Sequence, residues 1–391
     1  MRTKYDIIVV GGGPAGSTAA RYAALKGKSV LLLEKDRDIG IPVRCAEAVG
    51  EIGLRRFFDP KPDWISNRVN YARLIAPNGD VVKVSHDVGG YILNRKNFDF
   101  NLAQMAAEQG TDIVTKAHVL DCIRDAAGKI SGVKYVHLGK KYEVQAGIVI
   151  AADGVESRLS RLAGLNTALR LQDIETCVQM TVANIKLDKR YCDFYFSAKQ
   201  APGGYIWVFP RSDSSANIGL GISGEYNAQR PAIDYLKEFV RSYYPSAAIL
   251  TTFAGGVPCA PYMDRMVTDN FMVVGDAAHQ ANPLTGGGII LGIWAGSICG
   301  EVAADAIEDG DTSKKRLQQY EKKWYEAGGR THVRSYRLKE AVYRLTDDEL
   351  NQTAERINRL APDKRTLVSI FKTALIQNPK LIPDIIKVFL S

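Results

Sequence analysis

A glycine-rich segment between two short apolar runs constrains the fold of this chain more than any other feature. Residues 5–34 read YDIIVVGGGPAGSTAARYAALKGKSVLLLE. The pattern predicts a strand at Ile7–Val10, a helix at Ala15–Leu25 and a second strand at Ser29–Leu33 that ends before an acid. This order of strand, turn, helix, strand and acid is the context in which a G-x-G-x-x-G turn binds an adenine dinucleotide.

Each glycine of the turn has a separate predicted role. Gly11 allows the tight turn, Gly13 lets a pyrophosphate approach the backbone, and Gly16 lets the helix pack on the strand. The helix N-terminus then faces the phosphates with unpaired N–H groups and a positive dipole end. Glu34 follows about twenty residues later, where a carboxylate accepts the ribose hydroxyls and disfavours a 2′-phosphate.

Length and composition limit the class of protein. The 391 residues suffice for two domains and an extension. No run of about eighteen apolar residues occurs, so we expect no transmembrane helix. No basic–apolar–small signal peptide precedes the first strand, which predicts a cytoplasmic protein. The six cysteines form no C-x-x-C pair, which disfavours an iron–sulfur or zinc site, and we predict no metal.

The positive charge of the chain is concentrated near its C-terminal end. Residues 311–391 hold 17 Lys and Arg against 10 Asp and Glu, a surplus of 7 in a net charge of +8. An anionic lipid surface, a phosphorylated substrate and a solvated helical face are all compatible with this surplus. No nucleic-acid-binding motif accompanies it, so we expect no nucleic-acid partner. One helical face in the tail is apolar, which favours core packing: Leu367, Ile370, Phe371, Ala374 and Leu375.

Two later segments repeat the transition from strand to helix. The apolar run that ends in Ala152-Asp153-Gly154 meets a helix, and Gly275-Asp276 precedes a Gly-rich turn and a long apolar helix. An aspartate at a strand end can accept a ribityl hydroxyl, and a second helix N-terminus can stabilise an anionic ring or phosphate. Arg95 lies in the first turn of a helix, against the dipole. It indicates either an anionic partner such as a phosphate or a surface salt bridge.

Alternating segments between Glu175 and Thr252 predict an antiparallel sheet in a second domain. Tyr205, Trp207 and Phe209 alternate with other residues, so all three point to one face. They would line an apolar tunnel or, alternatively, form sheet core.

A second G-x-G-x-x-G match occurs at Gly219, Gly221 and Gly224. No obvious helix and no strand–acid unit follow it, so we do not interpret it as a dinucleotide turn. It predicts a strand whose glycines admit close approach of a ligand or a neighbouring backbone.

Cys45 directly follows Arg44 in a loop beyond the ribose acid. A cation beside a thiol can lower the pKa of the thiol and favour thiolate. The alternative is a small residue that lines a pocket.

The three strand-to-helix elements together resemble the FAD superfamily of aromatic hydroxylases, in which they hold one extended FAD. PVRCAEAV at 42–49 and YIWVFP at 205–210, followed by Gly219 and Gly221, resemble the geranylgeranyl reductase family, most closely its archaeal digeranylgeranylglycerophospholipid reductases. The resemblance spans almost the whole chain. It implies saturation of isoprenoid double bonds in ether phospholipid precursors, with peripheral contact to the cytoplasmic face of the membrane as an option.

The resemblance also implies a set of site residues. Tyr205, Trp207, Phe209, Gly219 and Gly221 would contact the substrate. The family has a glycine where this chain has Ala48. FAD would contact Gly11, Gly13, Ala15, Gly16, Glu34, Arg44, Cys45, Ala46, Ala48, Arg95, Val119, Asp276, Gly288 and Ile289.

The predicted fold class is α/β, with a Rossmann-like FAD-binding domain, an inserted antiparallel-sheet substrate domain and a helical C-terminal extension. The predicted bounds follow the segment order of the chain. They are 1–70, 91–165 and 265–310 for the FAD domain, 71–90 and 166–264 for the substrate domain, and 311–391 for the basic helical region.

The predicted chemistry is hydride transfer from reduced flavin to one alkene carbon and protonation of the other. Cys45, Tyr205 and an ordered water are the candidate proton donors. The external electron donor is not determined, with NADPH, a reduced deazaflavin and ferredoxin as candidates.

Three rival interpretations were weighed against this chemistry. A flavin monooxygenase or halogenase would share the first turn and the GYIWVFP motif, but no lysine can be assigned to the halogenase tunnel. An electron-transfer flavoprotein dehydrogenase would need a cysteine cluster that the chain lacks. A non-enzymatic membrane-surface protein would leave the FAD elements unexplained.

Overall fold

The computed structural model describes residues 2–84, 89–376 and 379–389. Residues 85–88 of the predicted segment 71–90, and residues 377–378 and 390–391 of the predicted tail, lie outside the described residues. The chain divides into two compact units of three segments each. Unit 1 comprises Met1–Val43, Arg95–Ala168 and Ala260–His332, and unit 2 comprises Arg44–Asn94, Leu169–Cys259 and Val333–Ser391.

These units and the predicted domains divide the chain differently, chiefly at residues 44–70 and in the C-terminal tail. We assigned residues 44–70 to the first domain, whereas in the structure they group with unit 2, because two of their segments pair into a small sheet of that unit. We also separated the whole tail, whereas its last part groups with unit 2. The predicted division into three functional domains stays a prediction.

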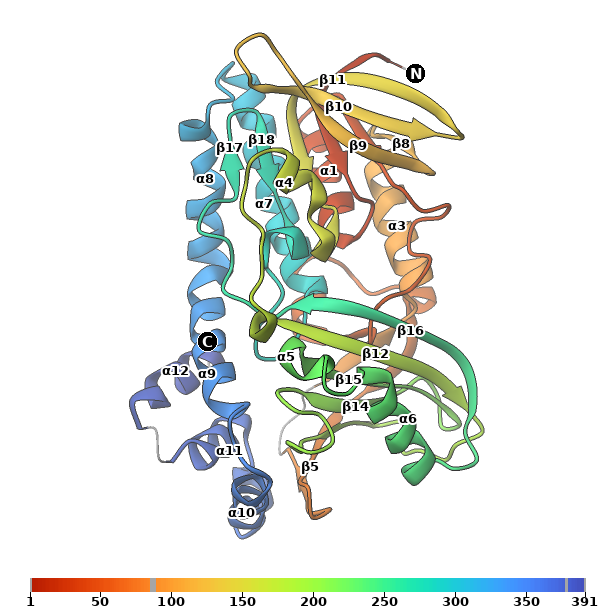
Figure 1. Cartoon of the computed structure of the whole chain (residues 1–391), viewed down its shortest axis with the longest axis vertical. Helices are drawn as coiled ribbons and strands as arrows, with labels where there is room; N and C mark the ends of the chain where they lie inside the picture. Colours follow the sequence, from red (N-terminus) through yellow and green to blue (C-terminus); the bar gives the residue numbers. More distant parts are fainter. Residues whose placement is uncertain (1, 85–88, 377–378, 390–391) are drawn as a thin grey trace. The chain divides into compact units, whose positions relative to one another are not determined.

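Unit 1 is built on an eight-stranded sheet in the order β17-β18-β11-β1-β2-β8, with β10 pairing to β11 and β9 (Figure 1). Strands β18, β11, β1, β2 and β8 are parallel neighbours, as expected for a Rossmann-like domain. The strands are β1 (Lys4–Val10), β2 (Val30–Leu33), β8 (Asp112–Val114), β9 (Ala117–Arg124), β10 (Ile130–His137), β11 (Lys140–Ala151), β17 (Val267–Thr268) and β18 (Phe271–Val273).

Helices cover the sheet of unit 1, and small residues lie where two of these helices pack most closely on each other. They are α1 (Pro14–Leu25), α3 (Arg95–Ala107), α4 (Arg158–Leu162), α7 (Ile289–Glu308) and α8 (Lys314–Trp324); α9 (Arg330–Val342) begins in unit 1 and ends in unit 2. Helix α7 packs on α1 through glycines: a Cβ on Gly296 would lie 2.4 Å from the Ala15 carbonyl oxygen, and one on Gly300 would lie 2.3 Å from that of Ala19.

Among the described residues, helix α7 is long and apolar enough to cross a membrane by length and composition alone. Of its most apolar window, 67% is buried inside the protein. Its glycines pack on α1, as those of a helix inside a protein core do. The expectation of no transmembrane helix stays a prediction.

Unit 2 contains a seven-stranded sheet in the order β16-β12-β15-β14-β13-β5-β6 and a three-stranded sheet in the order β3-β7-β4. The large sheet is antiparallel, as predicted, except that β13 and β5 are parallel. The strands are β3 (Ala48–Gly50), β4 (Ile65–Val69), β5 (Tyr71–Ile75), β6 (Val81–Lys83), β7 (Gly90–Leu93), β12 (Ile174–Ala183), β13 (Tyr191–Tyr195), β14 (Tyr205–Pro210), β15 (Ser215–Ser223) and β16 (Ala248–Pro258).

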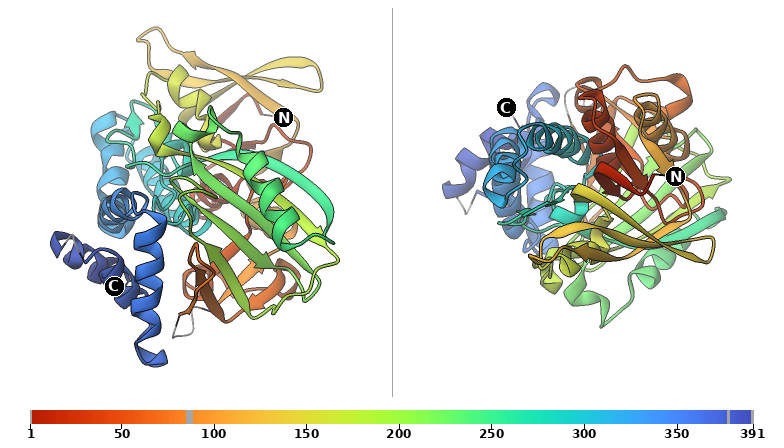
Figure 2. Two further views of the ribbon diagram at one scale, coloured as in Figure 1. Left: turned by 60° about the horizontal axis from the view of Figure 1, so that its bottom comes forward. Right: turned by 90° about the horizontal axis from the view of Figure 1, so that it is seen from above.

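The two faces of the large sheet carry different side chains. On one face, aliphatic residues such as Val178, Ile218 and Leu220 pack against Leu236 and Phe239 of α6, which lies across the strands (Figure 2, left). The other face is aromatic and polar and carries the candidate site. The helices of this unit are α2 (Glu51–Arg55), α5 (Gly224–Asn227), α6 (Ala232–Tyr243), α10 (Asp347–Asn358), α11 (Leu367–Ala374) and α12 (Ile382–Phe389).

The apolar stripe predicted in the tail is partly core. Ile370 of α11 and Ile357 of α10 are buried against Val82 and Val84 beside the β5–β6 hairpin. Phe371 stacks on Phe389 of α12, with ring centroids 4.6 Å apart.

Candidate functional site

The first glycine turn has no space for side chains at two of its three glycines. Gly11 has φ +110°, and a Cβ there would lie 2.2 Å from the Ala152 carbonyl oxygen. A Cβ on Gly16 would lie 1.9 Å from the Gly11 carbonyl oxygen. At Gly13, by contrast, no described atom lies within 4 Å of the Cβ position. The turn therefore packs tightly against the protein at its two ends and leaves its middle open to a ligand.

The groups around this turn fit an adenine dinucleotide. Glu34 accepts hydrogen bonds from the backbone N–H of Gly12 (2.6 Å) and of Asp36 (2.8 Å). These bonds fix the carboxylate beside the turn and leave it acceptor capacity for ribose hydroxyls. Helix α1 starts at Pro14 without a side-chain cap and without an acid in its first turn. Its positive end is therefore available to phosphates.

The structure brings the second and third glycine elements to the first. The Ala152 N–H donates to the Val10 carbonyl (2.8 Å). A Cβ on Gly275 would lie 2.8 Å from the Cβ of Ala15. The three elements that we predicted to hold one cofactor thus meet in unit 1.

The start of α7 lies beside Asp276. The Asp276 Oδ1 atom is 2.9 Å from the position of a Cβ on Gly288, which precedes Ile289, the first residue of α7. Burial raises the pKa of the Asp276 carboxyl, and the charge of Arg95 opposes this rise. No acid lies in the first turn of α7, so this helix end also suits an electron-rich group.

Arg95 has a protein partner. Its guanidinium makes a bidentate pair with Asp99 one turn later in α3, at 2.6 Å for both contacts, and both side chains are largely buried. This pair gives the cation in the first turn a protein partner, but it is largely buried and is not the surface salt bridge that we considered. Contact of Arg95, and of the half-buried Val119 on β9, with FAD stays a prediction.

Asp153 has a local role at the strand-to-helix turn. Its Oδ2 atom accepts from the Leu159 N–H (2.8 Å) in the five-residue helix α4, and burial raises the pKa of its carboxyl.

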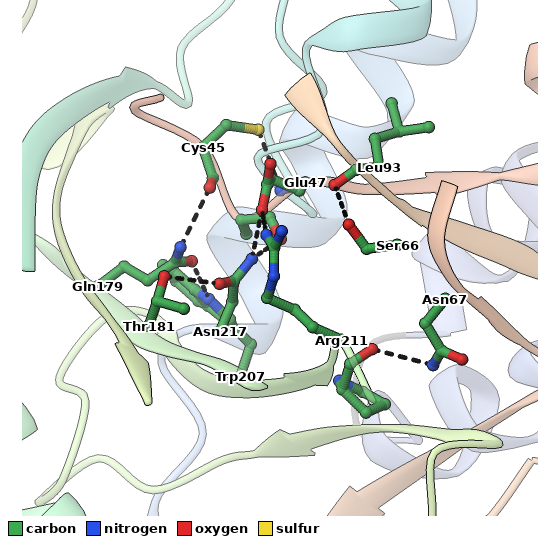
Figure 3. Close-up of polar contacts among 12 residues, drawn as sticks. Cys45, Glu47, Ser66, Asn67, Leu93, Gln179, Thr181, Trp207, Arg211 and Asn217 are labelled. Atoms are coloured by element: carbon green, nitrogen blue, oxygen red, sulfur yellow. Dashed lines mark hydrogen bonds and ion pairs between the residues drawn. The ribbon is translucent and has the colours of Figure 1, made fainter. Parts of the chain in front are cut away.

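The segment that carries Cys45 is bonded to the large sheet of unit 2 (Figure 3). The Cys45 carbonyl accepts from the Gln179 side-chain amide (3.2 Å), and the Trp207 indole N–H donates to the other end of that amide (2.8 Å). The Cys45 Sγ atom accepts from the Glu47 N–H (3.2 Å). Arg44 is exposed.

Glu47 is the second anchor of this segment. It adopts φ +71°, is 4% exposed, and pairs with Arg211. Its carboxylate also accepts from the Asn217 side-chain amide (2.8 Å), whose oxygen accepts from Thr181 (2.9 Å). The sequence alone did not indicate four of these residues: Glu47, Gln179, Asn217 and Arg211. The one available signal was the alternation of polar and apolar residues along β12.

Tyr205, Trp207 and Phe209 share one face of β14, as their alternation predicted. Ring centroids are 6.0 Å apart for Tyr205 and Trp207, and 6.2 Å apart for Trp207 and Phe209. Phe194 of β13 adds a fourth ring, 5.3 Å from Phe209. Ala46, Ala48 and Cys177 border the same cluster.

The second glycine set makes room for these rings. Gly219 is the cross-strand neighbour of Trp207, and a Cβ there would lie 2.4 Å from the indole. Gly221 pairs with Tyr205 on one side and with Cys177 on the other. Two glycines of the second G-x-G-x-x-G match therefore lie in strand β15, and the third, Gly224, begins the four-residue helix α5, which the sequence did not predict.

Fold and site define a flavoprotein oxidoreductase: a Rossmann-like dinucleotide unit with a ribose acid, and a sheet unit with an aromatic face. Residues 9–68 match the NAD(P)-binding Rossmann-like domain family, and residues 173–257 match the geranylgeranyl reductase catalytic domain. The digeranylgeranylglycerophospholipid reductase of Methanocella arvoryzae is 40% identical over 390 residues, 99% of each chain. This chain belongs to the geranylgeranyl reductase family, in its digeranylgeranylglycerophospholipid reductase branch.

Solved structures agree with this assignment. A geranylgeranyl bacteriochlorophyll reductase-like protein of Thermoplasma acidophilum has a TM-score of 0.90 and 34% identity, covering 98% of this chain and 99% of its own. A flavin-dependent brominase has a TM-score of 0.72 at 17% identity, covering 96% and 100%, which shows a common fold alone. The chain is an FAD-dependent oxidoreductase, as predicted. The individual cofactor and substrate contacts stay predictions.

Proposed function

We propose that this protein uses FAD to saturate geranylgeranyl double bonds in an ether phospholipid precursor such as digeranylgeranylglyceryl phospholipid. The observation that carries the proposal is the aromatic face of β14. It lies within residues 173–257, which match the geranylgeranyl reductase catalytic domain. Gly219 accommodates the Trp207 indole, so that three rings pack side by side on one face of β14, two of them buried and Tyr205 half-buried. Such a surface suits an isoprenoid chain, because apolar contact with it removes both from water.

The residues of unit 1 would hold the cofactor. Gly13 gives the pyrophosphate access to the backbone, Glu34 would bind the ribose, and Asp276 with the first turn of α7 would face the ribityl chain and ring. When bound and reduced, the flavin supplies a hydride.

The residues of unit 2 would bind the alkene and supply the proton. In each turnover the alkene π bond breaks, one carbon receives the hydride, and the other receives a proton. Cys45 and Tyr205 are the candidate side chains for that proton, since both are half-buried: Tyr205 belongs to the aromatic face, and the Cys45 carbonyl is bonded to the same Gln179 amide as Trp207. Burial raises the pKa of the Tyr205 phenol, so it is neutral and able to donate.

Two further parts of the proposal concern partners. We propose a cytoplasmic protein whose basic tail, with a surplus of 7 positive charges, contacts the anionic membrane surface that holds the substrate. Co-sedimentation with anionic vesicles but not with neutral ones, lost at high salt, would support this contact. The electrons come from an external donor of the nicotinamide, reduced deazaflavin or ferredoxin class. The rate at which each one bleaches the bound flavin would distinguish them.

The principal experiment is anaerobic. The purified yellow protein is reduced with dithionite, digeranylgeranylglyceryl phosphate is added, and flavin absorbance and product mass are followed. Flavin reoxidation with a product heavier by two hydrogen atoms per reduced bond supports the proposal. Reoxidation only after oxygen is admitted, with an oxygen atom in the product, would instead establish a monooxygenase.

A further inference from the structure

Unit 2 holds a buried carboxyl group that the proposed function has not used. Glu175 lies on β12, on the same face as Gln179, and is 5% exposed. Among the described residues, neither of its side-chain oxygens has a hydrogen-bond partner. An ionised carboxylate in this state is costly, because burial removes its water and no donor replaces it. A buried carboxyl group with a nearby charge partner is a candidate functional group.

Lys339 of α9 is the counter-charge of Glu175 but holds it loosely. Its ammonium is 3% exposed and lies 3.6 Å from Glu175 Oε1. The ammonium donates instead to the carbonyls of Gln172 (2.9 Å) and Cys259 (2.8 Å). These two bonds fix the cation, so its charge acts on Glu175 while the carboxyl oxygens remain free to hold a proton.

The other oxygen of Glu175 lies beside two glycines. A Cβ on Gly204 would lie 3.3 Å from Glu175 Oε2, and one on Gly221 would lie 3.8 Å from it. Any larger residue at Gly204 would press on this oxygen. Gly221 is the cross-strand neighbour of the half-buried Cys177 and Tyr205, and a Cβ on it would lie 3.2 Å from the Cys177 Sγ atom, so the thiol and the carboxyl border the same glycine.

The titratable groups that face Glu175 are Lys339 and Tyr343 from the C-terminal segment, Cys177 on its own strand, and Tyr205 on β14. Burial raises the pKa of the thiol and of both phenols, so these three are neutral. Burial also raises the pKa of Glu175 to about 7, with the Lys339 charge opposing the rise. Glu175 therefore changes charge near neutral pH, whereas the thiol and the two phenols do not.

We propose that Glu175, positioned by Lys339, is the proton reservoir of the reductase, and that it delivers its proton through Tyr205 or Cys177 to the alkene on the aromatic face. The inference rests on the proposed function. The reduction needs one hydride, which the flavin supplies, and one proton. The reservoir acid becomes a carboxylate as the second C–H bond forms, and solvent protonates it again before the next turnover. The intervening phenol or thiol gives one proton and receives one, and so ends unchanged.

The test is the pH dependence of single-turnover reduction with pre-reduced flavin. The wild-type rate should fall as the pH rises through about 7, because the reservoir must be protonated. Glu175→Gln keeps the shape of the side chain but removes its proton. In this variant we expect flavin content and reduction by dithionite to be unchanged and the rate of alkene reduction to fall about 100-fold. The descending limb of the pH–rate profile near pH 7 should disappear.

Two further variants separate the proton role from packing. Ser223→Ala is the matched control, since Ser223 is the cross-strand neighbour of Glu175 on β15 and its buried hydroxyl also lacks a partner among the described residues. It should keep the wild-type rate and profile. Lys339→Met should move the limb to higher pH, because loss of the positive charge raises the pKa of the carboxyl further. If Glu175→Gln does not fold, this shift in Lys339→Met decides the question.

The outcomes distinguish the inference from the proposed function. A wild-type rate and pH profile in Glu175→Gln, while the wild type reduces the alkene, would overturn the inference alone. An unmoved limb in a folded Lys339→Met would do the same. No alkene reduction by the wild type would overturn both.

Discussion

The chain contains the pattern G-x-G-x-x-G twice, and the two copies do different things. In the copy from Gly11 to Gly16, glycine is needed because backbone carbonyls approach within 2.2 and 1.9 Å of the missing Cβ atoms. In the copy that starts at Gly219, glycine is needed because an indole from the next strand approaches within 2.4 Å. The first set allows a turn in front of a helix, whereas the second lets a flat strand accept large rings. The spacing of glycines is therefore uninformative until the neighbouring element is known.

The largest expected effect is that of Gly16→Val. Even the first added carbon would overlap the Gly11 carbonyl, so we expect unit 1 to lose at least about 3 kcal/mol of stability. The protein should purify without flavin. Flavin absorbance per protein and the thermal midpoint test this, and wild-type occupancy in the variant would contradict the packing role.

Gly219→Ala should separate the two copies. The added methyl displaces the Trp207 indole and breaks its 2.8 Å bond to Gln179. We expect a loss of about 1–3 kcal/mol in unit 2, and alkene reduction at least about tenfold slower. Flavin occupancy should be unchanged and tryptophan fluorescence shifted. Loss of flavin with intact fluorescence would mean that the second copy also serves the cofactor.

Gly13→Ala tests the binding of the cofactor rather than the packing of the protein. No described atom lies within 4 Å of the new methyl, and φ is −71°, which any residue adopts. Apo-protein stability should stay within about 0.5 kcal/mol, while FAD affinity falls about tenfold or more. Ala15→Val is a poorer test, because its side chain already faces Gly275 and would crowd the protein first. Equal FAD affinity for wild type and Gly13→Ala would argue against a pyrophosphate here.

The smallest effect should be that of Gly221→Ala. Its methyl would lie 3.2 Å from the Cys177 Sγ atom, a tight contact that a small shift relieves. We expect a loss of about 1 kcal/mol in chemical denaturation. Gly255→Ala on β16, with no described atom within 4 Å of the methyl, is the matched control and should show no loss.

The same contrast explains what could be predicted from the sequence. The dinucleotide turn was predictable because its strand, glycines, helix and acid lie within thirty-four residues and each leaves a local signal. The shared face of Tyr205, Trp207 and Phe209 followed from alternation alone. The predicted α/β fold class was confirmed, because the patterns that indicate it are also local in the sequence.

The polar partners were not predictable, because they join distant segments. Gln179 meets Cys45 across 134 residues, and Asn217 meets Glu47 across 170. The periodicity of a sequence does not indicate contacts between such distant segments. Lys339 is a stronger case: it was counted within a basic tail that a solvated surface could explain, yet it is buried against Glu175. The net charge of a segment does not indicate which of its charged residues are buried.

The glycines of α7 have a consequence for mutational scanning. Gly296 and Gly300 touch backbone carbonyls of α1, and any added atom forces the helices apart. A complete substitution library would score them as intolerant as the residues that bind cofactor, and even alanine would fail. Intolerance to substitution at these positions results from the lack of space for a side chain, not from a role in catalysis or cofactor binding. Sensitive positions in this protein should therefore be sorted by flavin content and turnover before any is assigned to the active site.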